Sequence, residues 1–246
     1  MTKFIDRTGE EFITNEGEKI KIIDYNKTTR RLVVLFESTG NTKEVTYRNC
    51  QPGEVKNPYK KSVYDVGFLG DGKYKRSKNR ECYGEWLGML QRCYDPKRSR
   101  AYEGVTMYEE WHNFQNFAEW WYERVYNCNE QLCLDKDIKN KKAKMYSPET
   151  CLIVPQTINK LFNKQRFHRG QLCIGVMKTK NGKFEAQCSV KGKSTRIGTY
   201  DSELEAFNAY KDFKEKHIKK IAYEYKYIIP EEVYECMLNY EVDIDD

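Results

Sequence analysis

The sequence predicts an α+β protein with three folded parts: a small N-terminal β-barrel, a central part of strands and helices, and a C-terminal three-stranded antiparallel sheet packed on one helix. Three observations support this prediction. Apolar and polar residues alternate along short segments near both ends of the chain, apolar residues recur at helical spacing elsewhere, and glycines separate the segments.

Residues 1–58 are expected to form the barrel, of the SH3-like kind. The segments KIKIID, RLVVLFES and KEVTYRN alternate as half-buried strands do, and YNKTTR and TGNT separate them. Pro58 ends this domain, because proline cannot donate a hydrogen bond to a strand ladder and disfavours helix at Asn57.

Residues 59–165 are expected to form the central domain. Apolar residues at helical spacing predict one helix over 85–94, a second from about Glu109, and a short one after Pro155. The segment GFLGDGKY (67–74) nearly matches a phosphate-binding P-loop. Tyr74, however, stands where that motif needs a Ser or Thr hydroxyl, so the segment is interpreted as a glycine loop.

Residues 166–222 are expected to form three strands, over 172–177, 184–190 and 194–198, followed by a helix to about Ala222. The turns Asn181-Gly182 and Lys191-Gly192 join the strands, and a capping box from Ser202 to Glu205 begins the helix. The remaining residues, 223–246, hold eight acidic side chains and one basic one, and are expected as an acidic tail.

Charge is strongly segregated along the chain. Residues 56–100 hold twelve basic and five acidic side chains, and residues 160–200 hold ten basic and one acidic. Such segments indicate contact with a polyanion, because phosphate neutralisation drives most nucleic-acid affinity. Ordinary solvated lysines are the alternative.

Other features bound the class of protein. No stretch approaches the ~18 consecutive apolar residues of a membrane span, and the N-terminus lacks the pattern of a secretory signal, so we expect a cytoplasmic location and no membrane partner. Nine cysteines at scattered spacing argue against a disulfide framework. They are either buried thiols or, for Cys93, Cys128, Cys133 and Cys151, a zinc site.

The segment GVMKTKNGKFEAQCSVKGKSTRIGTYDSELEAFNAY resembles the three-stranded DNA-binding domain of plant ethylene-response factors (the Apetala type), over about residues 171–222. The plant pattern differs in strand two and has a tryptophan in strand three, so the resemblance does not define a DNA target. It implies binding of double-stranded DNA, with base contacts from alternate residues of the second and third strands. By position, the DNA-binding residues are Gln187, Ser189, Ser194 and Arg196, with Lys178, Lys180, Lys183 and Lys193 beside them.

The segments WLGMLQRCYDP, YEGVTMYEEWHNFQNFAEW, LDKDI and YSPETCLIVPQTIN resemble phage proteins of the HNH, or His-Me finger, kind that are related to homing endonucleases, over about residues 83–163. The resemblance implies a ββα domain that holds Mg²⁺ or Mn²⁺ through Asp135 and Asn159. The general-base position falls on Lys136, which is protonated near pH 7 with a reference pKa of ~10.4 and would instead bind phosphate. Lys141, Lys142 and Arg92 are further candidates for DNA contact.

The histidines His112, His168 and His217 are each expected to be structural or on the surface. A salt-bridged turn is the alternative role for Asp135 and Asp137. The sequence thus predicts a phage-type DNA-binding protein of the bacterial host cytoplasm, with weak metal-dependent nicking as a candidate enzymatic activity. The alternatives are a catalytically inactive DNA-binding regulator and an anti-defence inhibitor that contacts a host protein.

Overall fold

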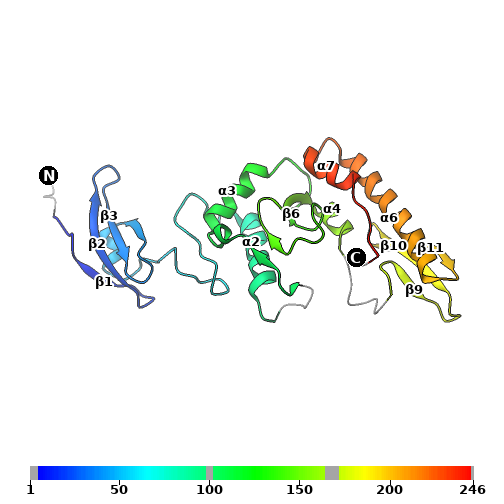
Figure 1. The fold of residues 1–246 in the computed structure, drawn as a ribbon. Helices are drawn as coiled ribbons and strands as arrows, with labels where there is room; N and C mark the ends of the chain where they lie inside the picture. Colours follow the sequence, from blue (N-terminus) through cyan, green and yellow to red (C-terminus); the bar gives the residue numbers. More distant parts are fainter. Residues whose placement is uncertain (1–4, 98–101, 164–171, 245–246) are drawn as a thin grey trace. The chain divides into compact units, whose positions relative to one another are not determined.

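The computed structural model describes residues 5–97, 102–163 and 172–244 of the 246-residue chain. The predicted α+β class is confirmed, and the chain divides into two compact units, Met1–Tyr122 and Glu123–Asp246 (Figure 1). The predictions for residues 164–171, His168 included, lie outside the described residues. Among the described helices, none is both long enough and apolar enough to cross a membrane.

The N-terminal strands form a four-stranded antiparallel sheet. Strands β1 (Glu11–Ile13), β2 (Lys19–Asn26), β3 (Arg31–Phe36) and β4 (Thr42–Val45) follow one another in order. Alternate residues of β2 and β3 are buried in one apolar cluster with Val45 and with Cys50 of helix α1 (Tyr47–Cys50). The prediction of a closed barrel was wrong, because the chain turns into α1 directly after β4 and β4 does not pair with β1.

The rest of the first unit is built on aromatic side chains. It contains α2 (Arg80–Tyr94), the short strand β5 (Thr106–Met107), the 3₁₀ helix η2 (Glu109–His112) and most of α3 (Phe114–Arg124). The helix predicted from Glu109 is therefore split in two. Asn113 marks the break, because its side-chain oxygen accepts a hydrogen bond from the backbone N–H of Gln115 and so caps α3.

In the second unit, β6 (Leu132–Asp135) pairs antiparallel with β8 (Leu152–Pro155), and α4 (Gln156–Leu161) follows β8 directly. The short strand β7 (Met145–Tyr146) lies between them in sequence. Asp135 is thus the last residue of its strand, and Asn159 lies on the helix. All four residues of β8 are buried, which explains why this apolar run does not alternate.

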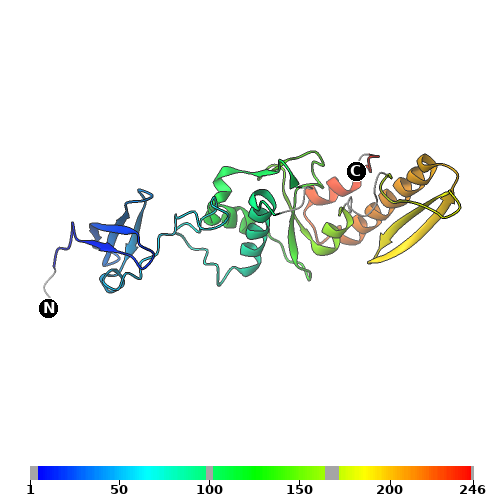
Figure 2. The same cartoon turned by 90° about the horizontal axis from the view of Figure 1, so that it is seen from below.

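The predicted C-terminal sheet is confirmed. Strands β9 (Val176–Lys178), β10 (Phe184–Val190) and β11 (Lys193–Tyr200) pair antiparallel in the order β11-β10-β9. Helix α6 (Glu203–Tyr225) lies along one side of these strands (Figures 1 and 2), and its capping box from Ser202 to Glu205 is present. Lys191 and Gly192 both have positive φ, as the tight turn between β10 and β11 requires.

The segment expected as an acidic tail is structured. Residues after Ala222 complete α6 and then form α7 (Glu231–Leu238), in which Val233, Tyr234 and Met237 are buried. These side chains share one apolar cluster with β8, α4, the inner side of the C-terminal sheet and α6. Glu231, Glu232 and Glu235 therefore occupy the solvent side of α7, whose other side belongs to the core.

Candidate nucleic-acid interface

The C-terminal sheet has one covered face and one open face. Ala186 and Cys188 of β10 are buried against α6, so the intervening residues point to the other side, which we call the outer face. Strand register then assigns cross-strand pairs to this face. They are Lys183 beside Asp201, Glu185 beside Thr199, Gln187 beside Arg196, and Ser189 beside Ser194.

The four residues predicted to contact bases therefore share one face. Ser189, Ser194 and Arg196 are exposed and Gln187 is half-exposed. Ser194 Oγ donates a hydrogen bond to Gln187 Oε1 at 2.8 Å, whereas the amide Nε2 of Gln187 has no hydrogen-bond partner within the described residues. The outer face thus offers a side-chain amide, two hydroxyls and a guanidinium in a compact array.

Arg196 is held on this face by two neighbours. Its Nε lies 2.9 Å from Glu185 Oε2, and its guanidinium also donates to Thr199 Oγ1 at 2.5 Å. Lys183 similarly pairs with Asp201 at 2.8 Å. Each cation of the outer face therefore has an acidic neighbour. This balance was not visible in the sequence, where residues 160–200 hold a single acidic side chain.

The lysines of this sheet that form no ion pair with a described residue lie at its ends. Lys180 is in the turn before β10, and Lys191 and Lys193 are at the turn after it, at the opposite end of a strand of seven residues. At ~3.3 Å per residue the two turns are separated by about 23 Å. Lys178 pairs with Phe184 and so lies on the α6 side of the sheet rather than on the outer face.

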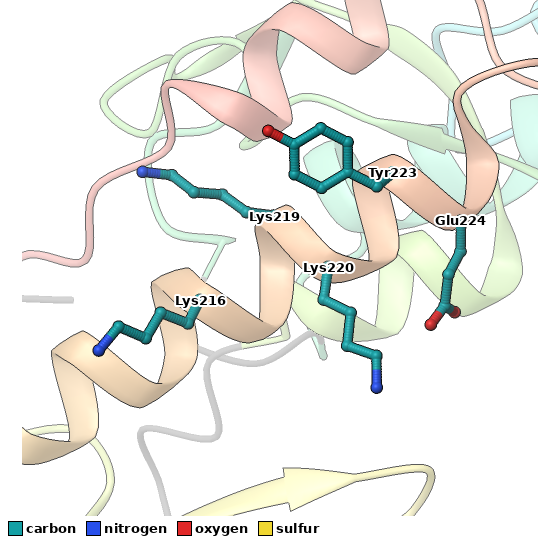
Figure 3. A pocket seen from close by; sticks show the side chains of 5 residues that line it. All are labelled: Lys216, Lys219, Lys220, Tyr223 and Glu224. Atoms are coloured by element: carbon teal, nitrogen blue, oxygen red, sulfur yellow. The ribbon is translucent and has the colours of Figure 1, made fainter.

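A second group of cations lies on α6. Figure 3 shows Lys216, Lys219, Lys220, Tyr223 and Glu224 projecting from the helix around a shallow hollow of about 540 Å³. The buried residues Ile218, Ile221 and Ala222 occupy the other side of the same helix. Because α6 covers the inner side of the sheet, a duplex lying on the outer face would not reach this group.

Asp135 closes the turn after β6. Its Oδ1 accepts hydrogen bonds from the backbone N–H groups of Asp137 and Ile138, each at 2.8 Å. The side chain is buried, and burial raises the pKa of its carboxyl to about 6 although the two backbone hydrogen bonds lower it. This oxygen therefore has a structural role in the turn, in addition to any ligand role expected from the resemblance.

The two other residues of the predicted centre differ in their surroundings. Lys136 is buried, with its Nζ 2.5 Å from Asp137 Oδ1 and 5.7 Å from the centre of the Tyr146 ring. Asn159 is half-buried on α4. Of the two ligands expected from the resemblance, Asp135 already accepts two backbone hydrogen bonds at Oδ1, and Asn159 carries a side-chain amide oxygen on α4. Within residues 5–97, 102–163 and 172–244, no three His, Cys, Asp or Glu side chains are grouped as metal ligands.

The basic turn after Asp137 contacts the C-terminal segment. Lys139 pairs with Glu232 of α7, and Lys141 Nζ donates to the backbone oxygen of Glu241 and lies 4.3 Å from the centre of the Tyr240 ring. Lys142 is exposed, whereas Arg92 is half-buried on α2 in the first unit. Of these candidates for DNA contact, Lys142 presents its charge most openly.

Two described histidines have structural surroundings. His112 Nε2 lies 2.7 Å from the Tyr94 hydroxyl, and burial lowers the pKa of its ring. His217 stacks on Phe213 with ring centres 6.5 Å apart, and burial and nearby lysines lower the pKa of its ring as well. Among the residues that the structure describes, neither ring has an acidic hydrogen-bond partner of the kind that orients a general base.

Two residues of the outer face were missed by sequence reasoning. A β-bulge after Ala186 inserts Ile197, so that Thr199, rather than Gly198, shares the face with Arg196. Met177 of β9 pairs with Glu185 and is exposed there. Strict alternation from Arg196 along the third strand would place Thr199 on the α6 side of the sheet. Its position on the outer face is therefore seen only from the pairing of β10 with β11.

Comparison with protein-family models, with curated proteins and with solved structures finds no match to this chain.

Proposed function

We propose that this protein binds double-stranded DNA and that the outer face of β9–β11 contacts base edges in the major groove. The observation that carries this proposal is the convergence of Gln187, Ser189, Ser194 and Arg196 on one open face of a sheet whose other face is covered by α6. Strands are known to enter the major groove in β-sheet DNA-binding proteins. The resemblance to the Apetala-type domain supports the same face.

The chemistry of these side chains suits base edges. A glutamine amide can form two hydrogen bonds with adenine, a guanidinium can form two with guanine, and serine hydroxyls can donate or accept. In the unbound protein, Glu185 holds the guanidinium of Arg196 in place through their ion pair. On contacting guanine, Arg196 would share this contact or leave it. The lysines at both sheet ends would lie over phosphates that border a groove ~12 Å wide.

Arg196→Ala should reduce the preference for the best duplex by about 1 to 3 kcal/mol, because it removes a base contact, whereas Lys180→Ala should weaken binding to all duplexes alike. The best duplex is first selected from a random pool, and affinities are then measured on it and on single-base variants.

A matched control removes charge from the opposite side of the unit. The triple variant Lys216→Gln, Lys219→Gln and Lys220→Gln should retain both affinity and base preference within about twofold. When DNA lies on the outer face, these three lysines do not contact its phosphates. Equal losses for Arg196→Ala and Lys180→Ala on every duplex would remove the base-contact assignment. A large loss of affinity in the α6 variant would indicate that DNA binds on the α6 side of the unit and not on the outer face.

Metal-dependent nicking is a second candidate activity of the same protein. It is supported by the order of β6, β8 and α4, a strand pair followed directly by a helix, with Asp135 at the end of the first strand and Asn159 on the helix. This order agrees with the ββα domain that the HNH resemblance implies. In this proposal the ion supplies Lewis acidity when bound, and Lys136 would exchange its buried ion pair with Asp137 for the phosphate.

Nicking is tested with Asp135→Asn, because asparagine keeps an oxygen for the turn and loses the negative charge. Supercoiled plasmid is incubated with Mg²⁺ or Mn²⁺ and the open-circular form is measured. Cleavage by the wild type that is lost in the variant supports the activity, and cleavage retained in the variant excludes Asp135 as a required ligand. Without cleavage by either protein, DNA binding alone remains proposed.

A further inference from the structure

The first unit carries a strongly basic loop, residues 69–80, which leads into α2. Its cationic side chains are all exposed. They are Lys73, Lys75, Arg76, Lys78 and Arg80. Its own acidic residue is Asp71, and the acidic side chain that reaches it from α3 is Glu119. The loop therefore presents a surplus of positive charge over a short length of chain.

One side chain of α3 fixes the conformation of this loop. Gln115 Oε1 accepts from the backbone N–H of Tyr74 at 3.0 Å, and its Nε2 donates to the backbone oxygens of Leu69 and Tyr74 at 3.0 and 2.9 Å. The amide thus bonds to the loop as a neighbouring strand would, although it is more than forty residues away in sequence.

The glycines of the loop allow this close approach. Gly70 has a positive φ of +65°, and a Cβ there would lie 2.1 Å from Asn113 Oδ1. A Cβ at Gly72 would lie 2.3 Å from Gln115 Oε1. The glycines of GFLGDGKY therefore serve contact with the start of α3, which is a different role from the cradling of nucleotide phosphates that the P-loop pattern suggests.

The cations on the loop are weakly engaged. Lys73 lies 3.4 Å from Glu119, and Lys75 lies 3.9 Å from Asp71. Because all four side chains are well exposed, these ion pairs contribute little to the free energy of folding. The Arg76 guanidinium is 5.1 Å from the centre of the Tyr83 ring. Lys78 and Arg80 make no ion pair with any described residue.

We propose that the basic loop binds the phosphate backbone of double-stranded DNA without contacting bases. This inference rests on the proposed function and deepens it. Lys183 and Arg196 of the outer face have acidic neighbours, so the sequence-independent attraction to phosphate depends on other cations, which are the lysines at the sheet ends and, in the first unit, the basic loop. The loop supplies positive charge in a conformation that is already ordered, which reduces the entropy lost on binding.

The test compares two triple variants that remove the same charge from the same unit. The loop variant is Lys75→Gln, Arg76→Gln and Lys78→Gln. The control is Lys27→Gln, Arg30→Gln and Arg31→Gln, three exposed residues at the end of the β2–β3 hairpin. Affinity for a duplex of random sequence is measured over about 50 to 200 mM salt.

The loop variant should reduce the slope of log affinity against log salt by about 2 to 3, since each lost phosphate contact removes ~0.9. Its affinity should fall by about tenfold or more on all duplexes, with base preference unchanged. The control should keep the wild-type slope. Equal effects of the two variants, or an unchanged slope in the loop variant, would overturn the inference.

These outcomes separate the loop from the sheet. An unaffected loop variant together with lost base preference in Arg196→Ala would overturn phosphate binding by the loop and support base contact by the sheet. The reverse pattern would overturn base contact by the sheet and support phosphate binding by the loop. Absence of salt-dependent binding by the wild type would overturn both.

Gln115→Met tests the ordering of the loop without changing its charge. Methionine has a similar length but neither accepts from nor donates to the backbone of Leu69 and Tyr74. Affinity should fall by about three- to tenfold because the loop is then ordered only on binding, while the salt slope stays close to that of the wild type. An unchanged affinity would show that ordering of the loop by Gln115 does not contribute to DNA binding. The loop variant involves only exposed side chains, so it decides the proposal even if Gln115→Met folds poorly.

Discussion

Replacing Gly175 with alanine is expected to destabilise the second unit by about 3 kcal/mol. Two costs combine at this position. Gly175 has φ of +76°, which costs an L residue about 1 to 2 kcal/mol. A Cβ there would also lie 2.1 Å from Tyr210 Cδ2, and forcing atoms into a packed interior costs about 1 to 3 kcal/mol more.

Gly182→Ala is the matched control. Gly182 has a similar φ of +80°, but a Cβ there meets no atom within 4 Å, so only the backbone cost of about 1 to 2 kcal/mol applies. All four tryptophans lie between residues 86 and 121, so tryptophan fluorescence follows the first unit. Hydrogen exchange of β10 peptides in the full chain should therefore be used. Equal loss of protection in both variants would contradict packing of Gly175 against Tyr210.

Asp135→Ala is expected to destabilise the second unit by about 2 to 4 kcal/mol. The change leaves the backbone N–H groups of Asp137 and Ile138 without their acceptor, and an unsatisfied buried donor costs about 1 to 3 kcal/mol. Asp135→Asn keeps an acceptor and should be at least as stable as the wild type at pH 7. Chemical denaturation followed by hydrogen exchange of the β6 region measures both. An alanine variant as stable as the asparagine variant would show that the turn does not need this oxygen.

The same carboxyl should make stability depend on pH. Its pKa is raised to about 6 in the folded protein from 3.8, so the folded state binds the proton more tightly. The contribution of this group to the free energy of unfolding therefore decreases as pH rises from about 4 to 6, by about 2 to 3 kcal/mol. Asp135→Asn should remove that decrease, and an identical pH profile in the variant would contradict the shifted pKa.

Local signals in the sequence predicted much of the C-terminal fold. The capping box at Ser202 depends on residues three apart, and the alternation in β10 depends on residues two apart, so both can be recognised in a short window. The placement of Gln187, Ser189, Ser194 and Arg196 on one face follows from that alternation. These features agree with the structure because neighbouring residues determine them.

Features that depend on distant residues were not predictable in this way. The ion pair between Arg196 and Glu185 requires the strand register, and the position of Thr199 requires the bulge. The contact of Gln115 with the basic loop joins segments far apart in sequence. The burial of α7 could have been suspected, because Val233, Tyr234 and Met237 recur at helical spacing, but the surrounding acidic residues dominated the composition.

The most direct test of DNA binding is the affinity of the wild-type protein for double-stranded DNA over about 50 to 200 mM salt. Phosphate contacts from the sheet ends and the basic loop predict that log affinity falls linearly with log salt, with a slope of about −4.5 to −6.3 if about five to seven phosphates are neutralised. An affinity that does not change with salt, or no binding at the lowest salt, would contradict the account.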